Sequence, residues 1–192
     1  DSLRLRTTVN LPAMGPLSMK FSYLHDESHG WMKNKLGGQK MNYSVREPSF
    51  GTLTYADRLG ARNVDAFQLA AHFAPGGDFT ADYRFDYTDS KTVGSPVQVL
   101  GHTGSLAGAT ALIFSLQQQY GGTTNLVGSG SPLKTVANST SVQPLKVQGH
   151  NLTMAWQASD NFTVKSITGF RKFKQKPNAF DLAGTGGLLF TE

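Results

Sequence analysis

The stretch DFTADYRFDYTDS, residues 78–90, alternates between two kinds of side chain. Successive side chains of a β-strand point to opposite faces, so the stretch is predicted to be a strand with one aromatic and one charged face. The aromatic face holds Phe79, Ala81, Tyr83, Phe85 and Tyr87, and the charged face includes Asp82, Arg84 and Asp86. The aromatic face must contact either a protein core or lipid.

Five other segments repeat this alternation, so the chain is expected to form about six strands of roughly 9–12 residues. Such strands are longer than the five or six residues usual in soluble sheets. The chain is therefore predicted to be all-β. From alternation alone, a soluble half-buried sheet and a transmembrane β-barrel both remain open, because each has one apolar face.

The connections between the predicted strands alternate between short and long. Tight turns rich in Pro, Gly, Ser or Asp follow the first, third and fifth strands, at about residues 12–15, 75–77 and 159–160. The other two connections are predicted to be long loops at about residues 26–62 and 90–148. In an antiparallel meander all short turns then lie at one end and all long loops at the other, as in outer-membrane barrels with short periplasmic turns.

The composition agrees with strands that are polar on one face. Charged residues are 16% of the chain, below the roughly 25% typical of soluble domains, and there is no cysteine for disulfides or thiolate metal sites. The net charge of +5 comes from scattered basic residues, so no nucleic-acid partner is expected. A helical stripe of apolar residues predicts a short helix at residues 105–120, inside the second long loop.

The sequence carries no recognisable catalytic signature. It has no nucleophile elbow, phosphate-binding loop, dinucleotide motif or zinc-protease motif, so no enzyme activity and no cofactor are expected. The segment HDESH, residues 25–29, is the most metal-like cluster, but the chain is expected to leave a strand there. Solvated loop residues are the simpler interpretation, and no metal site is predicted.

Three segments resemble TonB-dependent outer-membrane receptors. WQASDNFTVKSITGFRKF, residues 156–173, resembles a barrel hairpin of this family, with Phe170 in place of the family's tyrosine. HGWMKN, residues 29–34, is similar to a motif that follows the family's second barrel strand. Residues 63–90 look like its third and fourth strands, and the three segments occur in the family's order.

The resemblance implies the N-terminal part of a 22-stranded barrel in the outer membrane of a Gram-negative bacterium. Such receptors import scarce solutes (ferric siderophores, cobalamin, saccharides) with energy from an inner-membrane complex. The plug domain and the segment that contacts this complex are expected outside residues 1–192. The lipid-facing residues would be Phe79, Tyr83, Phe85 and Tyr87, and the lumen-facing residues Asp82, Arg84 and Asp86.

Solute contact is expected from the two long loops, where aromatic and cationic side chains are suited to stacking or to anionic chelates. The residues predicted to make it are His29, Trp31, Arg46, Tyr55 and Tyr120. Packing within the loops is the alternative for each of them. Two other functions remain open: a passive porin or adhesin barrel, and a soluble β-sheet binding module.

Overall fold

The structure is a computed structural model that describes residues 1–44, 48–95, 135–136, 138–181 and 189–191. Every regular element in these ranges is a β-strand, which confirms the predicted all-β class. The helix predicted at residues 105–120 lies outside the described residues. The strands are β1 (Ser2–Asn10), β2 (Leu17–Ser28), β3 (Met32–Asn34), β4 (Lys40–Asn42), β5 (Thr52–Thr54), β6 (Arg58–Leu59), β7 (Arg62–Phe73), β8 (Phe79–Thr92), β9 (Thr135–Val136), β10 (Gln143–Ser159), β11 (Phe162–Gln175), β12 (Ala179–Asp181) and β13 (Leu189–Thr191).

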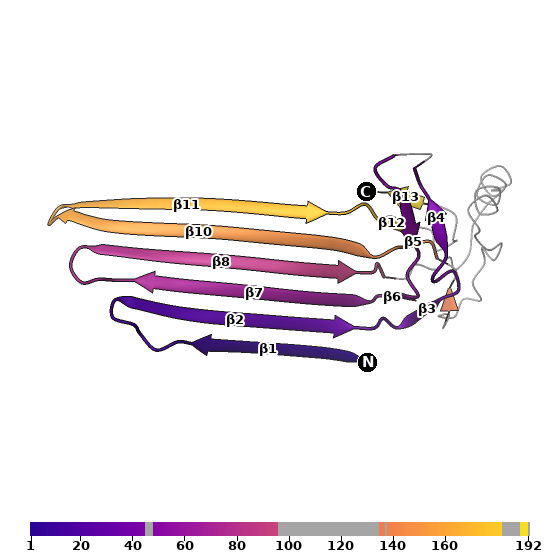
Figure 1. The fold of residues 1–192 in the computed structure, drawn as a ribbon, viewed down its shortest axis with the longest axis horizontal. Helices are drawn as coiled ribbons and strands as arrows, with labels where there is room; N and C mark the ends of the chain where they lie inside the picture. Colours follow the sequence, from indigo (N-terminus) through magenta and orange to yellow (C-terminus); the bar gives the residue numbers. More distant parts are fainter. Residues whose placement is uncertain (45–47, 96–134, 137, 182–188, 192) are drawn as a thin grey trace, which may run out of the picture.

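Six long strands form one sheet in the order β1-β2-β7-β8-β10-β11 (Figure 1). All five neighbouring pairs are antiparallel, so the predicted meander of six strands is confirmed. The strands range from 9 residues in β1 to 17 in β10. Among the described residues the sheet is open, with β1 and β11 as its two edges.

Short turns join the long strands at one end of the sheet and long connections at the other (Figure 1). The predicted loop bounds need correction, because β2 runs to Ser28, β8 to Thr92 and β10 begins at Gln143. The charged residues at the end of β2 resemble a loop in sequence, yet β2 pairs with β7 as far as Ser28 and Arg62. The start of β10 was not predicted, because Pro144 and Gly149 interrupt the alternation of apolar and polar residues there.

The described parts of the two long connections and of the segment after β11 fold into a small unit at the loop end of the sheet, here called the cap. The cap comprises β3, β4, β5, β6, β9, β12, β13 and the described residues that join them. It contains a three-stranded sheet in the order β6-β3-β9, in which β3 and β9 are parallel, and the hairpins β4-β5 and β12-β13. The first long connection is therefore a folded structure with its own sheet pairing.

The buried apolar residues of the described chain lie in the cap. Leu36, Tyr43, Tyr55 and Ala179 form one cluster, and a second cluster joins Met32 to Leu59. The long strands contribute no apolar residue to this buried set, and within the described residues no layer of secondary structure covers either face of their sheet (Figure 1). The large sheet thus has two uncovered faces, which differ in their chemistry.

Candidate functional site

One face of the large sheet is predominantly apolar, although β11 contributes Ser166 and Thr168 to it between Val164 and Phe170. Residues opposite each other in antiparallel strands share a face, and Phe85 lies opposite Leu69 of β7 and His150 of β10. Leu69 in turn lies opposite Phe21 of β2, and His150 lies opposite Phe170 of β11. The same parity of β8 places all four residues predicted to face lipid on this apolar face: Phe79, Tyr83, Phe85 and Tyr87.

Towards the loop end, the apolar face finishes in a row of aromatic rings. Tyr23 lies opposite Phe67, which lies opposite Tyr87, and the ring centroids are 5.0 and 6.4 Å apart. The next row outward, here called the charged row, consists of His25, Asp65, Asp89, Lys146 and Lys174. The apolar surface therefore changes to a charged one within a single step of the strand register.

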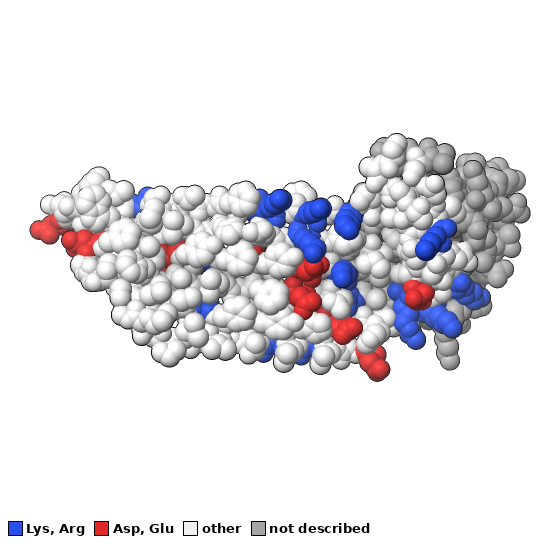
Figure 2. All heavy atoms as spheres, in the orientation of Figure 1, with Lys and Arg blue, Asp and Glu red and all other residues white. Residues whose placement is uncertain are grey.

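Hydrogen bonds link the aromatic row to the charged row and join the charged groups to each other. The Tyr23 hydroxyl donates to Asp65 Oδ1 at 2.6 Å, and His25 Nδ1 lies 2.9 Å from the same oxygen. Lys146 Nζ lies 2.9 Å from Asp89 Oδ2. Figure 2 shows a largely uncharged surface over the strands, crossed by a band of acidic and basic side chains near the loop end.

The apolar face is exposed over a long distance. Phe79 and Tyr87 of β8 bound it, and at about 3.3 Å per residue they are about 26 Å apart along the strand. Trp156 is 52% exposed and Phe170 58%. Monomeric soluble proteins rarely expose apolar surface continuously over several strands. This face is therefore expected to contact an apolar partner or an apolar medium.

The apolar face contains one imidazole, and neighbouring side chains satisfy it. His150 Nδ1 shares a 2.7 Å hydrogen bond with the Tyr83 hydroxyl, and Nε2 lies 2.9 Å from Gln148 Nε2. The His150 ring also contacts Phe85, with ring centroids 5.0 Å apart. Because both ring nitrogens have partners, a polar side chain is accommodated among aromatic ones.

The opposite face of the sheet is polar and carries the three residues predicted to face a lumen, Asp82, Arg84 and Asp86. Both aspartates contact other strands: Arg171 of β11 reaches across β10 to form an ion pair with Asp86, its Nη2 2.8 Å from Oδ2, and His72 Nδ1 of the adjacent β7 shares a 2.8 Å hydrogen bond with Asp82 Oδ1. The polar face also contains exposed apolar groups on β11, such as Phe173. The alternation on β11 is therefore incomplete, as its irregular sequence suggested.

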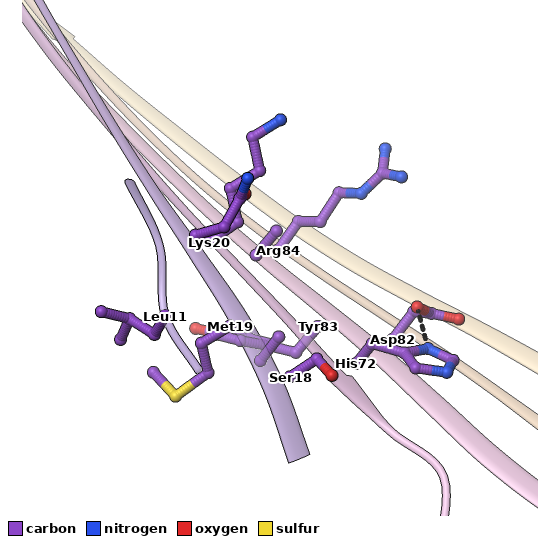
Figure 3. Close-up of a pocket in the computed structure, with 11 residues that line it drawn as sticks. Leu11, Ser18, Met19, Lys20, His72, Asp82, Tyr83 and Arg84 are labelled. Atoms are coloured by element: carbon purple, nitrogen blue, oxygen red, sulfur yellow. Dashed lines mark hydrogen bonds and ion pairs between the residues drawn. The ribbon is translucent and has the colours of Figure 1, made fainter. Parts of the chain in front are cut away.

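Near the turn end, the polar face has a hollow of about 330 Å³ (Figure 3). Lys20 and Arg84 lie on either side of Ala70 in the strand register, and the methyl group between them leaves this space. Both cationic side chains project to the same side of the sheet, whereas Met19 extends to the other (Figure 3). An extended solute could lie along this surface and contact the cations from one side.

A larger cavity of about 520 Å³ lies where the cap meets the loop end of the sheet. Its charged lining consists of Glu27, His29, Asp57, Arg58, Arg62 and Lys91. Arg62 Nε is held 2.8 Å from Asp26 Oδ1, and the Arg58 guanidinium donates to the Gly30 carbonyl at 3.4 Å. The cavity is large enough for a small ligand and offers charges of both signs.

The residues predicted to contact solute occupy different environments. His29 lines the larger cavity, and its side chain is 66% exposed. Tyr55 is only 2% exposed, and its hydroxyl lies 3.1 Å from that of Tyr43 in the cap interior, so its side chain serves packing in this structure. Arg46 and Tyr120 lie outside the described residues.

Trp31, also predicted to contact solute, presents its ring on the surface of the cap and is 67% exposed. The ring lies against Gly60, where an added Cβ would be 2.8 Å from the indole nitrogen. Gly60 has φ +71°, a backbone conformation that glycine adopts readily. Glycine at this position therefore lets one side of the indole pack closely on the backbone while much of the ring stays accessible.

Asn34 holds the two long connections together, a role that sequence reasoning did not assign. Its side-chain nitrogen donates to the carbonyls of Ala56 at 2.7 Å and Asn138 at 2.8 Å. Its oxygen accepts hydrogen bonds from the backbone nitrogens of Leu36 at 3.1 Å and Asn138 at 2.9 Å. All four bonds are buried, so this one amide fixes the second long connection to the first.

The HDESH segment is split by the strand pleat. His25 and Glu27 lie on the apolar side of β2, and Asp26 lies on the polar side. No group of three or more metal-ligating side chains is found within the described ranges. The described residues also contain no helix with the length and hydropathy of a membrane span.

The cavity residues Arg58, Arg62 and Lys91 were not predicted as solute contacts. Each adjoins a strand end that was predicted only approximately, and no motif distinguishes it from other surface cations.

Comparison of the chain with family models, curated proteins and solved structures finds no match.

Proposed function

We propose that residues 1–192 form part of a transmembrane β-barrel in a bacterial outer membrane. The observation that carries the proposal is the six-stranded sheet with one apolar and one polar face and no covering layer among the described residues. Soluble domains bury the apolar face of a sheet against a second layer. A barrel wall instead faces lipid on one side and water on the other.

The dimensions of the apolar face support this environment. Barrel strands tilt by about 35–45° from the membrane normal, so about 26 Å along β8 corresponds to about 20 Å of membrane thickness. This approaches the apolar band of about 25 Å on outer-membrane barrels. The aromatic row of Tyr23, Phe67 and Tyr87 has the position of an interfacial girdle, and the charged row beyond it would lie among headgroups.

The finer proposal is a TonB-dependent receptor that captures a scarce solute at the cap and transports it along the polar face. It rests on the three sequence segments that resemble this family in order. The cap adds support, because it presents Trp31 and the lining of the larger cavity at the loop end. A ferric chelate, cobalamin or a saccharide is the proposed solute, and the inner-membrane complex would act through parts outside these residues.

Circular dichroism of the chain with and without lipid tests the membrane part of the proposal. In plain buffer we expect no cooperative β-structure, because the apolar face has no partner there. In phosphatidylcholine vesicles we expect a β-sheet spectrum and resistance of the long strands to trypsin. A cooperative thermal transition of a β-fold in plain buffer would instead establish a soluble binding module.

Solute capture is tested with the vesicle-inserted chain. The variant Trp156→Phe leaves Trp31 as the single indole, since the chain has two tryptophans. Titration with ferric hydroxamate chelates, cobalamin and malto-oligosaccharides should give a saturable change in Trp31 emission for one class. If none of the three classes changes the emission, Trp31 is not part of a capture site for them.

A further inference from the structure

The charged residues at the loop end of the apolar face are mostly divided by sign across the sheet. On β2, β7 and β8 the face carries the acidic residues Glu27, Asp65 and Asp89, and one basic residue, Lys91, follows Asp89 two residues further along β8. On β10 and β11 it ends in Lys146, Lys172 and Lys174. Figure 2 shows most of this division, with basic side chains gathered over the loop end of β10 and β11 and mainly acidic ones over the neighbouring strands.

Acidic neighbours balance only part of the positive charge of these lysines. Lys146 is paired with Asp89 at 2.9 Å. Lys172 and Lys174 are exposed, and no hydrogen bond or ion pair joins their side chains to other described residues. Lys174 lies directly opposite Lys146, and like charges facing each other across a sheet repel. An anion placed between these ammonium groups would relieve the repulsion.

The position of the lysines indicates which anion they would bind. Lys172 follows Phe170 by two residues on the same face, so its aliphatic stem can lie along exposed apolar surface while its ammonium reaches outward. A lipid places a negative headgroup directly above apolar chains, so one molecule would contact both the lysines and Phe170. A free anion in water would contact the lysines alone.

We propose that Lys172 and Lys174, together with Lys146, bind the phosphate groups of anionic lipids at the outer boundary of the apolar face. This inference rests on the proposed lipid contact of that face. Basic residues near a membrane surface each strengthen binding to anionic lipid by about 1 kcal/mol, which is roughly five-fold at room temperature. The site would retain a shell of selected lipid beside β10 and β11.

Fluorescence quenching by brominated lipid measures this selection. Phe170→Trp, combined with Trp31→Phe and Trp156→Phe, places a single indole two residues from Lys172 on the same face. The variant is inserted into vesicles of phosphatidylcholine and phosphatidylglycerol in equal amounts, with bromine on the acyl chains of one lipid or the other. We expect the association constant for phosphatidylglycerol to exceed that for phosphatidylcholine by on the order of five-fold or more.

Substitution of the lysines separates their effect from general attraction to the bilayer. Lys172→Gln with Lys174→Gln should lower the ratio of association constants to about one. Lys165→Gln removes the same charge from the polar face of the same strand and should leave the ratio unchanged. Inorganic phosphate at the headgroup concentration should not displace the brominated phosphatidylglycerol.

Each other outcome overturns a defined part of the inference. Equal quenching by the two lipids in the parent variant would overturn lipid selection while leaving the membrane proposal intact. Displacement by inorganic phosphate would identify a site for free anions instead of lipid. The absence of quenching by either lipid would remove the lipid contact itself, and the proposed function would fail together with this inference.

Discussion

An arginine placed on the apolar face should destabilise the membrane-inserted chain, whereas an arginine on the neighbouring polar position should not. Leu152 and Thr153 are consecutive residues of β10 and belong to opposite faces, opposite Tyr83 and Asp82 of β8. The variants Leu152→Arg and Thr153→Arg therefore add the same side chain to the same strand at nearly the same depth. Only the face differs between them.

The expected magnitude follows from the depth of Leu152. Tyr83 lies midway between Phe79 and Tyr87, about 13 Å from each along the strand and about 10 Å from each boundary after tilting. An arginine in the middle of a barrel's apolar band costs about 2–4 kcal/mol, so Leu152→Arg should lower the free energy of unfolding by about this amount. Thr153→Arg gains Asp82 as a neighbour and should change it by less than about 1 kcal/mol.

Guanidinium unfolding in phosphatidylcholine vesicles, followed by Trp156 emission in chains that also carry Trp31→Phe, measures both variants. Gln148→Arg provides a third point, because Gln148 lies opposite Tyr87 at the edge of the apolar face. Its cost should be about 0–1 kcal/mol if this edge lies at the membrane interface. Equal costs for Leu152→Arg and Thr153→Arg, or a larger cost at Thr153, would refute the assignment of the apolar face to lipid.

Two further predictions concern single positions. Asn34→Asp replaces an amide nitrogen that donates two buried hydrogen bonds, to the carbonyls of Ala56 and Asn138, so the cap should lose roughly 2–4 kcal/mol. Hydrogen exchange at the Ala56 amide, which donates to the Thr140 carbonyl at the same contact, should accelerate with β-sheet circular dichroism unchanged, and retained protection at Ala56 would contradict this account. Gly149→Ala places a Cβ 2.5 Å from Asp86 Oδ1 and should lower the free energy of unfolding by about 1–3 kcal/mol, measured in denaturant. Gly169→Ala, whose nearest atoms lie at 3.9 Å, should lower it clearly less. Similar losses for the two variants would show that Gly149 is not needed for the close approach of Asp86.

The long strands and their two faces could be predicted from the sequence because alternation is a local property. Each side chain of residues 78–90 is assigned to a face by its parity, and the structure keeps that parity through β8. The ends of the strands were harder to predict from the sequence. Asp26 resembles a loop residue until its pairing with Arg62 of β7 is known, since that partner lies 36 residues away.

The cap could not be predicted from local patterns. Asn34 belongs to a segment noted for its resemblance to receptors, yet its hydrogen-bond partner Asn138 is 104 residues further along the chain. Tyr55 was chosen as an aromatic loop residue, but the packing of the loop on itself buries it. Composition indicates that such side chains can bind a solute, whereas only tertiary structure determines which of them remain exposed.

The most direct test of the central claim is the depth of Trp156 in the membrane. Trp156 lies on the apolar face beside Phe79, near the turn end, and the variant Trp31→Phe makes it the only indole. In vesicles of brominated phosphatidylcholine, we predict strong quenching that is greater with bromine near the headgroup than near the end of the acyl chain. Trp31 in the converse variant, Trp156→Phe, should not be quenched. If Trp156 emission is unaffected by brominated lipid while the chain is folded, the apolar face does not contact lipid and the barrel proposal is wrong.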